Sequence, residues 1–179
     1  NQPFRIALGQ HDTLDNFLFK IKLKNGVIGF GEAAVATHIT GETLPQTHKN
    51  LLAHGQKLLG RSVEDYFDIS ALLHQELPNN KAALAAVEMA ILDALTRSLK
   101  IPLWRFFGEK PAKLRTDITI VIDDLENTQK KTREFYAQGF RAFKIKIGRD
   151  MDQDLKRVLA VSAIAKEAKL YLDANQGYS

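Results

Sequence analysis

Apolar and polar residues alternate along the first part of this chain before the spacing becomes helical. The alternation predicts strands at 4–8, 16–24 and 27–34, because successive strand side chains point to opposite faces of a sheet. Asn25-Gly26 separates the last two strands, and this dipeptide is a strong signal for a two-residue hairpin turn. We therefore expect an antiparallel meander, with the polar segment 9–15 as a loop between its first two strands.

Helices are predicted after this meander. From residue 43 apolar residues recur every three or four positions, which predicts helices over 43–59, 62–77 and 81–98. A short apolar segment, 101–108, closes this part of the chain at a glycine. Strands followed by helices are typical of an α+β domain, which we expect to cover residues 1–110.

Strands and helices alternate strictly in the rest of the chain, which we expect to form a second domain over 111–179. The pattern predicts strands and helices in the order βαβαβ, at 117–122, 123–138, 142–147, 150–168 and 170–173. Short connections in this order are typical of parallel strands covered by helices.

Composition excludes several classes of function. The chain contains no cysteine, so it has no disulfide, thiolate nucleophile or zinc–thiolate site. The formal net charge of +4 is spread along the sequence without a basic block, which argues against a nucleic-acid surface. No apolar run is long enough for a membrane span and no signal peptide is recognisable, so we expect a soluble cytoplasmic protein. The five histidines lack metal-ligand spacing.

Two lysines, Lys144 and Lys146, interrupt the apolar strand predicted at 142–147, and their spacing places both on one face. A solvated edge strand is one explanation, since exposed lysine blocks unwanted strand pairing. The same alternation, however, brings Thr119 and Asp173 of the neighbouring strands to the lysine face. In an open sheet with helices on both sides that face should be apolar. In a barrel it is the interior, and polar residues near the C-terminal strand ends mark an active-site mouth.

These side chains suit the removal of a proton next to a carboxylate. Burial and a neighbouring ammonium each lower the pKa of a lysine, and a neutral lysine accepts protons. A carboxylate at a strand end, Asp173, suits Mg²⁺, which prefers oxygen ligands. A lysine base beside a metal-bound carboxylate substrate is the arrangement that removes the α proton while the metal stabilises the enediolate.

Several motifs resemble the muconate-lactonising (mandelate racemase/muconate lactonizing enzyme) subgroup of the enolase superfamily. Lys144-Ile145-Lys146 matches its K-x-K motif, and Asp173-Ala174-Asn175 matches its first metal-ligand motif. Residues 102–108 match the end of its capping domain. Within the subgroup, residues 3–8, 29–33 and 39–43 are similar to dipeptide epimerases of the L-Ala-D/L-Glu epimerase type. The resemblance implies an α+β capping domain followed by the first three strands of an α/β TIM-type barrel, incomplete in this chain.

The resemblance also implies roles for individual residues. Lys146 would be the acid/base on one face of the substrate, and Lys144 would hold the substrate carboxylate and lower the pKa of Lys146. Asp173 would bind Mg²⁺ with Asn175 beside the metal site, and Thr119 would contact the substrate. The implied activity is Mg²⁺-assisted abstraction of the proton α to a carboxylate, with epimerisation of a dipeptide as the outcome.

Alternatives to this activity remain open. One is a muconate cycloisomerase or an o-succinylbenzoate synthase-like enzyme, another is a non-catalytic folded fragment, and a homo-oligomer is compatible with either. Residues 9–15 and 37–41 match the family's specificity lid, but Gly9 stands where epimerases selective for an acidic residue carry arginine. Only three of the family's strands precede Ser179, so we expect a longer protein in which this stretch alone is inactive.

Overall fold

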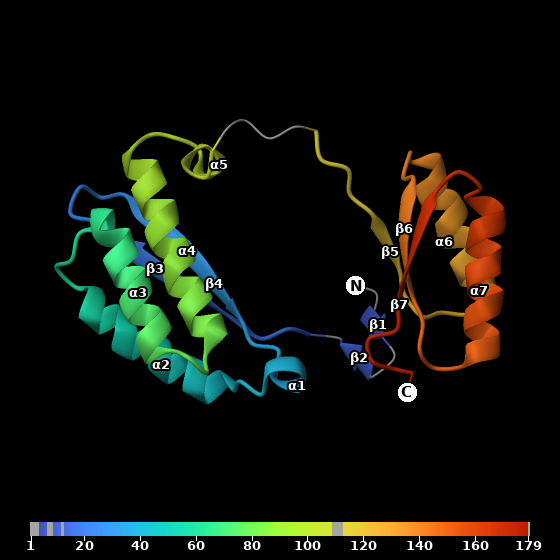
Figure 1. The fold of residues 1–179 in the computed structure, drawn as a ribbon, viewed down its shortest axis with the longest axis horizontal. Coiled ribbons are helices and arrows are strands. Elements are labelled where there is room, and N and C mark those ends of the chain that lie inside the picture. Colours follow the sequence, from blue (N-terminus) through green and yellow to red (C-terminus); the bar gives the residue numbers. More distant parts are fainter. Residues whose placement is uncertain (1–3, 7–8, 12, 109–112, 179) are drawn as a thin grey trace. The chain divides into compact units, whose positions relative to one another are not determined.

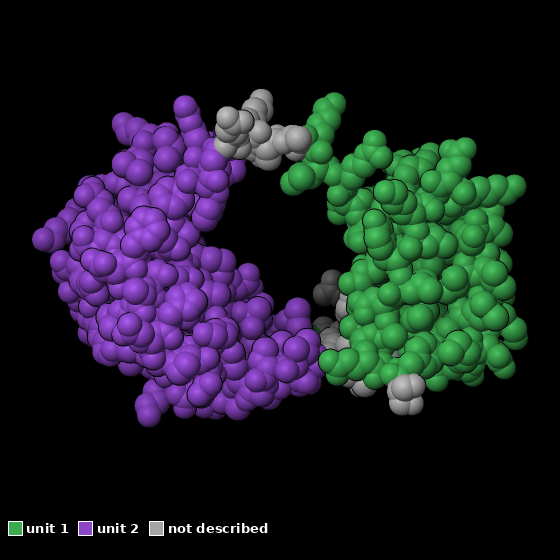
Figure 2. Space-filling model, viewed as in Figure 1, with its two compact units in different colours: residues 1–13, 113–179 green, residues 14–112 purple. Residues whose placement is uncertain are grey.

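The computed structural model describes residues 4–6, 9–11, 13–108 and 113–178. The chain divides into two compact units, unit 1 with residues 1–13 and 113–179 and unit 2 with residues 14–112 (Figure 2). Each unit has its own hydrophobic core. The domain limits expected from the sequence, 1–110 and 111–179, stay a prediction.

Unit 2 is a β-hairpin covered by helices (Figure 1). Strands β3 (Asn16–Lys22) and β4 (Ile28–Ala34) pair antiparallel across the predicted Asn25-Gly26 turn, where Gly26 has a φ of 87° that suits glycine. The helices are α1 (Thr37–Thr40), α2 (Leu44–Leu58), the 3₁₀ helix η1 (Val63–Asp65), α3 (Tyr66–Glu76), α4 (Lys81–Ser98) and α5 (Leu103–Phe106). These elements confirm the helices expected between residues 43 and 98.

Helix α4 packs directly on the hairpin because two glycines of β4 leave room for its backbone. A Cβ atom on Gly29 or Gly31 would collide with the carbonyl oxygen of Ala90 or Ala86. The core of unit 2 is formed around this contact by residues such as Val87, which is fully buried. The close approach explains why two glycines stand at alternate positions of a strand.

The first predicted strand pairs differently from the expectation. Strand β1 (Phe4–Ile6) pairs antiparallel with β2 (Gly9–His11), and not with β3. The predicted three-stranded meander is therefore wrong. The loop expected at 9–15 is also wrong for residues 9–11, which form β2. The physical reason is that segments only two residues apart close a hairpin at a lower entropic cost than distant ones. Residues 7, 8 and 12 lie outside the described part of the chain.

Residues 37–41, which the sequence likened to the family's specificity lid, contain the short helix α1. Directly after it, the buried Glu42 accepts hydrogen bonds from the backbone N–H groups of Lys81 and Ala82, at 2.8 and 3.0 Å. These groups belong to the first turn of α4, which lacks intrahelical partners for its N–H groups. Glu42 thus attaches the end of this segment to α4.

Unit 1 contains three parallel strands in the order β5-β6-β7 (Figure 1). The strands are β5 (Ile118–Ile120), β6 (Ala142–Lys146) and β7 (Lys169–Asp173), connected by helices α6 (Leu125–Ala137) and α7 (Met151–Ile164). Asp124 and Asp150 begin these helices as N-caps by accepting hydrogen bonds from backbone N–H groups. The sheet confirms the predicted start of an α/β barrel, which does not close within this chain.

Both helices of unit 1 cover one face of the sheet (Figure 1). Phe143 and Ile145 of β6 are fully buried in the core beneath them, together with Ile120 of β5 and Val161 of α7. Because strand side chains alternate, the residues between these apolar positions project from the other face. Within the described residues no helix is long and apolar enough to cross a membrane.

Candidate active site

The candidate site lies at the C-terminal ends of β6 and β7. The parallel register places Lys146 opposite Asp173, and Lys144 opposite Thr119 of β5. The two lysines alternate with the buried Phe143 and Ile145, so they project from the face that the helices leave open, as the sequence predicted. The fold therefore brings Lys144, Lys146 and Asp173 together from two strands, with Thr119 in the adjacent strand.

One carboxylate holds both ammonium groups. The Nζ atoms of Lys144 and Lys146 each lie 2.8 Å from Oδ2 of Asp173. Lys146 also donates a hydrogen bond of 2.7 Å to Oδ1 of Asn175, and the backbone N–H of Asn175 donates to Oδ1 of Asp173 at 2.9 Å. Both carboxylate oxygens of Asp173 are thus engaged by residues of the two motifs singled out in the sequence.

The two lysines differ in their access to solvent. The side chain of Lys146 is 7% exposed, whereas that of Lys144 is 37% exposed. A buried amine with fixed partners has a defined position, and a half-exposed one has room for a ligand beside it. This difference is consistent with separate tasks for the two residues.

The contacts determine the charges at the site. The hydrogen bonds from Lys144 and Lys146 hold the pKa of Asp173 well below its usual range. The hydrogen bond to Asp173, followed by the attraction of its charge, raises the pKa of Lys144. The expectation that the lysine pair favours neutral amines is therefore wrong for Lys144, because the carboxylate outweighs burial.

Asp173 and Asn175 offer neighbouring oxygen atoms of the hard type that Mg²⁺ prefers. Within the described residues, however, no group of three His, Cys, Asp or Glu side chains is close enough to hold a metal ion. The donor set fits Mg²⁺ in chemistry but amounts to only part of a coordination shell, in which Asp173 is the one carboxylate.

Sequence reasoning missed two residues of α7 that reach the same strand end. Asp154 and Arg157 are 4% and 3% exposed and form an ion pair with each other. Arg157 also donates a hydrogen bond of 3.1 Å to the main-chain carbonyl of Lys146. The signal that could have found them is an oppositely charged pair three residues apart on the helix face that otherwise packs in the core.

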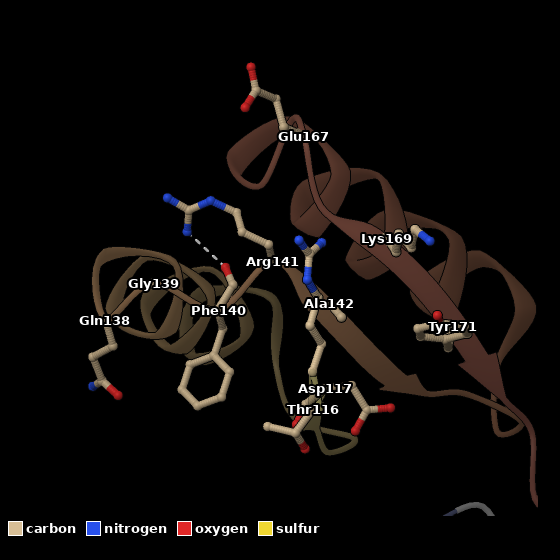
Figure 3. Close-up of a pocket in the computed structure, with 11 residues that line it drawn as sticks. Thr116, Asp117, Gln138, Gly139, Phe140, Arg141, Ala142, Glu167, Lys169 and Tyr171 are labelled. Carbon is tan, nitrogen blue, oxygen red and sulfur yellow. Dashed lines mark hydrogen bonds between the residues drawn. The ribbon is translucent and has the colours of Figure 1, made fainter. Parts of the chain in front are cut away.

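A separate hollow of about 770 Å³ lies at the other end of the strands (Figure 3). It is lined by Ala142 and Lys169, the first residues of β6 and β7, and by Asp117, which directly precedes β5. Its lining includes neither Lys146 nor Asp173. In Figure 3 the guanidinium group of Arg141 donates a hydrogen bond to the carbonyl of Phe140 beside this hollow. We place the candidate site at the C-terminal strand ends, because there Lys144 and Lys146 share the carboxylate of Asp173.

Comparison with known proteins shows which proteins this chain is similar to. A hydrophobic dipeptide epimerase from Citrifermentans bemidjiense is 48% identical over 99% of this chain and 50% of its own length. An aromatic dipeptide epimerase from Herpetosiphon aurantiacus is 36% identical, again over 99% of this chain and 50% of its own length. A crystal structure of a dipeptide epimerase from Enterococcus faecalis, complexed with Mg and L-Leu-L-Tyr, matches with a TM-score of 0.93 and 31% identity. That match covers 100% of this chain and 51% of that one.

Family models match most of the sequence. The N-terminal domain of mandelate racemase/muconate lactonizing enzyme matches residues 1–108, and the enolase C-terminal domain-like family matches residues 127–179. The chain spans about half the length of the curated relatives it matches. It therefore belongs to the mandelate racemase/muconate lactonizing enzyme group of the enolase superfamily, as its capping-domain, K-x-K and D-x-N motifs predicted.

Proposed function

We propose that this chain supplies one side of a site that epimerises a dipeptide by Mg²⁺-assisted transfer of its α proton. The observation that carries the proposal is the buried amine of Lys146, fixed on Asp173 beside the more exposed Lys144. Support also comes from the relatives, which are epimerases of hydrophobic and aromatic dipeptides.

In this proposal the lysines have different tasks. Lys146, in its neutral form, takes the proton from the α-carbon, and the electron pair of the broken C–H bond moves into the carboxylate as an enediolate. The ammonium group of Lys144 binds the carboxylate and offsets its growing negative charge. Thr119, in register with Lys144 on the adjacent strand, contacts the substrate. Returning a proton to the opposite face of the α-carbon inverts its configuration.

The carboxylate of Asp173 is the part of the metal site that this chain provides, with Asn175 beside it. When bound there, Mg²⁺ supplies a Lewis acid that stabilises negative charge on the substrate carboxylate. Inversion needs a second base on the other face of the substrate, and the lysine pair serves one face only. We therefore propose that the remaining base and metal ligands come from outside this chain, in a longer protein.

The test is proton exchange at the α-carbon in deuterated water. The full-length protein is incubated with Mg²⁺ and a set of hydrophobic, aromatic, basic and acidic dipeptides, and loss of the α-proton signal is followed by NMR. We expect exchange with inversion at the C-terminal residue, tested first on hydrophobic dipeptides because of the relative that is 48% identical. Absence of exchange with every dipeptide would contradict the proposal.

The same experiment separates the alternatives. Turnover of a non-peptide carboxylate, without exchange of any dipeptide, would favour the cycloisomerase or o-succinylbenzoate synthase reading. A non-catalytic protein would show neither reaction, and its thermal stability would not change with Mg²⁺ and dipeptide, because a ligand stabilises only the folded state that binds it.

A further inference from the structure

We propose that the buried ion pair of Asp154 and Arg157 is a positioning device for Lys146, which holds the end of β6 in place for proton transfer. The inference rests on the proposed function, since it assigns Lys146 the role of base. It concerns two α7 residues that touch the main chain around the lysine and that project from a helix on the other face of the sheet.

The contacts of Arg157 lead directly to Lys146. One guanidinium nitrogen donates to the main-chain carbonyl of Lys146 at 3.1 Å, and the other is paired with Oδ1 of Asp154. The carbonyl belongs to the same residue as the reacting amine, so fixing its peptide plane fixes the point from which the side chain extends. The planar, forked guanidinium suits this double contact, which a lysine at position 157 could not make in the same geometry.

The contacts of Asp154 hold the turn that follows the strand. Its Oδ2 atom accepts hydrogen bonds from the backbone N–H groups of Gly148 and Arg149, at 2.6 and 3.3 Å. Gly148 has a φ of 113°, a conformation that residues with a side chain rarely adopt. The last backbone contact with β7 is the hydrogen bond of 3.1 Å from Ile147 to Asp173. Beyond that point the chain is held by α7.

Asp154 also connects to the segment after β7. The hydroxyl group of Tyr178 donates a hydrogen bond to Oδ2 of Asp154. Tyr178 follows Asp173 and Asn175 in the chain, and both of these residues accept hydrogen bonds from the amine of Lys146. A single carboxylate therefore joins the strand end that carries the base to the segment that carries its partners.

The burial of this pair favours a specific task over general stabilisation. Asp154 and Arg157 are each at least nine-tenths buried, and removing two charges from water costs about as much as their attraction returns. Well-packed apolar residues would often give equal or greater stability at such positions. What apolar residues could not provide is the set of hydrogen bonds to the backbone on both sides of Lys146.

The experiment measures α-proton exchange separately for the two epimers of one dipeptide, in the full-length protein with Mg²⁺. Lys146→Ala identifies the epimer whose proton faces Lys146, because only that exchange depends on this base. Arg157→Lys and Asp154→Asn are then compared with Asp152→Asn, a matched control at an exposed carboxylate on the same helix. Tyr178→Phe, at a partly exposed position, is a milder variant that keeps the test valid if the buried substitutions impair folding.

We expect the three test variants to lower exchange of the Lys146-facing epimer, by about tenfold or more for Arg157→Lys, since misplacement of about 1 Å costs up to about a hundredfold. The loss should appear in kcat and not in KM, because Lys144 still binds the carboxylate. Exchange of the other epimer, and both exchanges in Asp152→Asn, should stay as in the unsubstituted protein.

Equal losses for both epimers, or unchanged exchange in the folded variants, would overturn the positioning role and leave the proposed function intact. Absence of exchange in the unsubstituted protein would overturn the proposed function, and this inference with it.

Discussion

The two ends of the three-stranded sheet carry similar numbers of charged residues but organise them differently. At the starts of the strands, the exposed Arg115, Arg141 and Lys169 surround an open hollow together with acidic residues. At the C-terminal ends, Lys144 and Lys146 share one oxygen of Asp173. Concavity alone would identify the start of the strands as the candidate active site. Burial and a common hydrogen-bond partner identify the C-terminal end instead.

The difference lies in how far each charge is fixed. Exposed charges in water interact weakly and keep their side-chain freedom, so a group of them is ordinarily a solvated surface. A buried amine with carboxylate and amide partners has lost that freedom and is held in one place. Positioned groups of this kind are what proton transfer requires. The comparison therefore predicts that substitutions at the C-terminal end affect catalysis, and that those at the other end do not.

The largest effect is expected for Lys146→Ala. Loss of the base on one face should lower the rate of epimerisation by about a hundredfold to ten-thousandfold, the range usual for general acid–base groups. The rate is measured as kcat/KM with the fold verified by circular dichroism. Lys169→Ala, at the start of β7, is the matched control and should keep the full rate. A comparable loss in both variants would remove the distinction between the two ends.

A smaller loss is expected for Asp173→Asn. The substitution keeps the shape of the side chain but removes its negative charge. That charge pairs with two ammonium groups and, in our proposal, binds Mg²⁺. Loss of about 3 kcal/mol of charge stabilisation corresponds to a loss of about a hundredfold in turnover, the lower end of the range expected for Lys146→Ala. Mg²⁺ affinity is measured by calorimetry in the same variant, with Glu167→Gln as the control at an exposed carboxylate of the other end. Unchanged Mg²⁺ affinity in Asp173→Asn would contradict its assignment.

A stability effect is expected for Asp154→Asn. Burial by itself would raise the pKa of Asp154, but hydrogen bonds from Tyr178, Gly148 and Arg157 outweigh it and hold that pKa below its ordinary value. Breaking a buried ion pair costs about 3–5 kcal/mol of the free energy of unfolding at neutral pH. Urea denaturation of the full-length protein measures this difference, and Asp152→Asn should show almost none of it.

The same depressed pKa gives this difference a pH dependence. The stability contributed by the Asp154 charge is fully present above the pKa of about 3.9 of an unfolded aspartate, and is lost as the pH falls through the lower folded value. The gap between the unsubstituted protein and Asp154→Asn should therefore narrow only in acid. A gap that closes already between pH 8 and pH 6 would rule out the carboxylate as its cause.

The smallest effect is expected for Arg141→Ala at the start of β6. Arg141 donates to the carbonyls of Tyr136 and Phe140 and lies 3.9 Å from the centre of the Tyr136 ring. At an exposed site these contacts together contribute about 1 kcal/mol, so unfolding should become easier by about that amount. Epimerisation should be unaffected, and a catalytic defect would show that the hollow belongs to the active site.

The strand pattern could be predicted from sequence because it depends on local rules. Alternation alone placed Lys144 and Lys146 on one face, and the parallel register brought Asp173 to them. The pairing of β1 with β2 was missed, since alternation identifies a strand but not its partner. The raised pKa of Lys144 was missed as well, because its direction depends on which charge lies nearest in space. Asp154 and Arg157 were missed because charged helix residues ordinarily face solvent, although their spacing places them on the core-facing side of α7 with Val161.

The most direct test of Lys146 as the base is α-proton exchange by Lys146→Ala, followed in deuterated water for each epimer of a hydrophobic dipeptide in turn. We expect that one epimer no longer exchanges while the other still does, because this chain serves only one face of the substrate. Retained exchange of both epimers, in a folded protein that binds Mg²⁺, would contradict the assignment of Lys146 as the base.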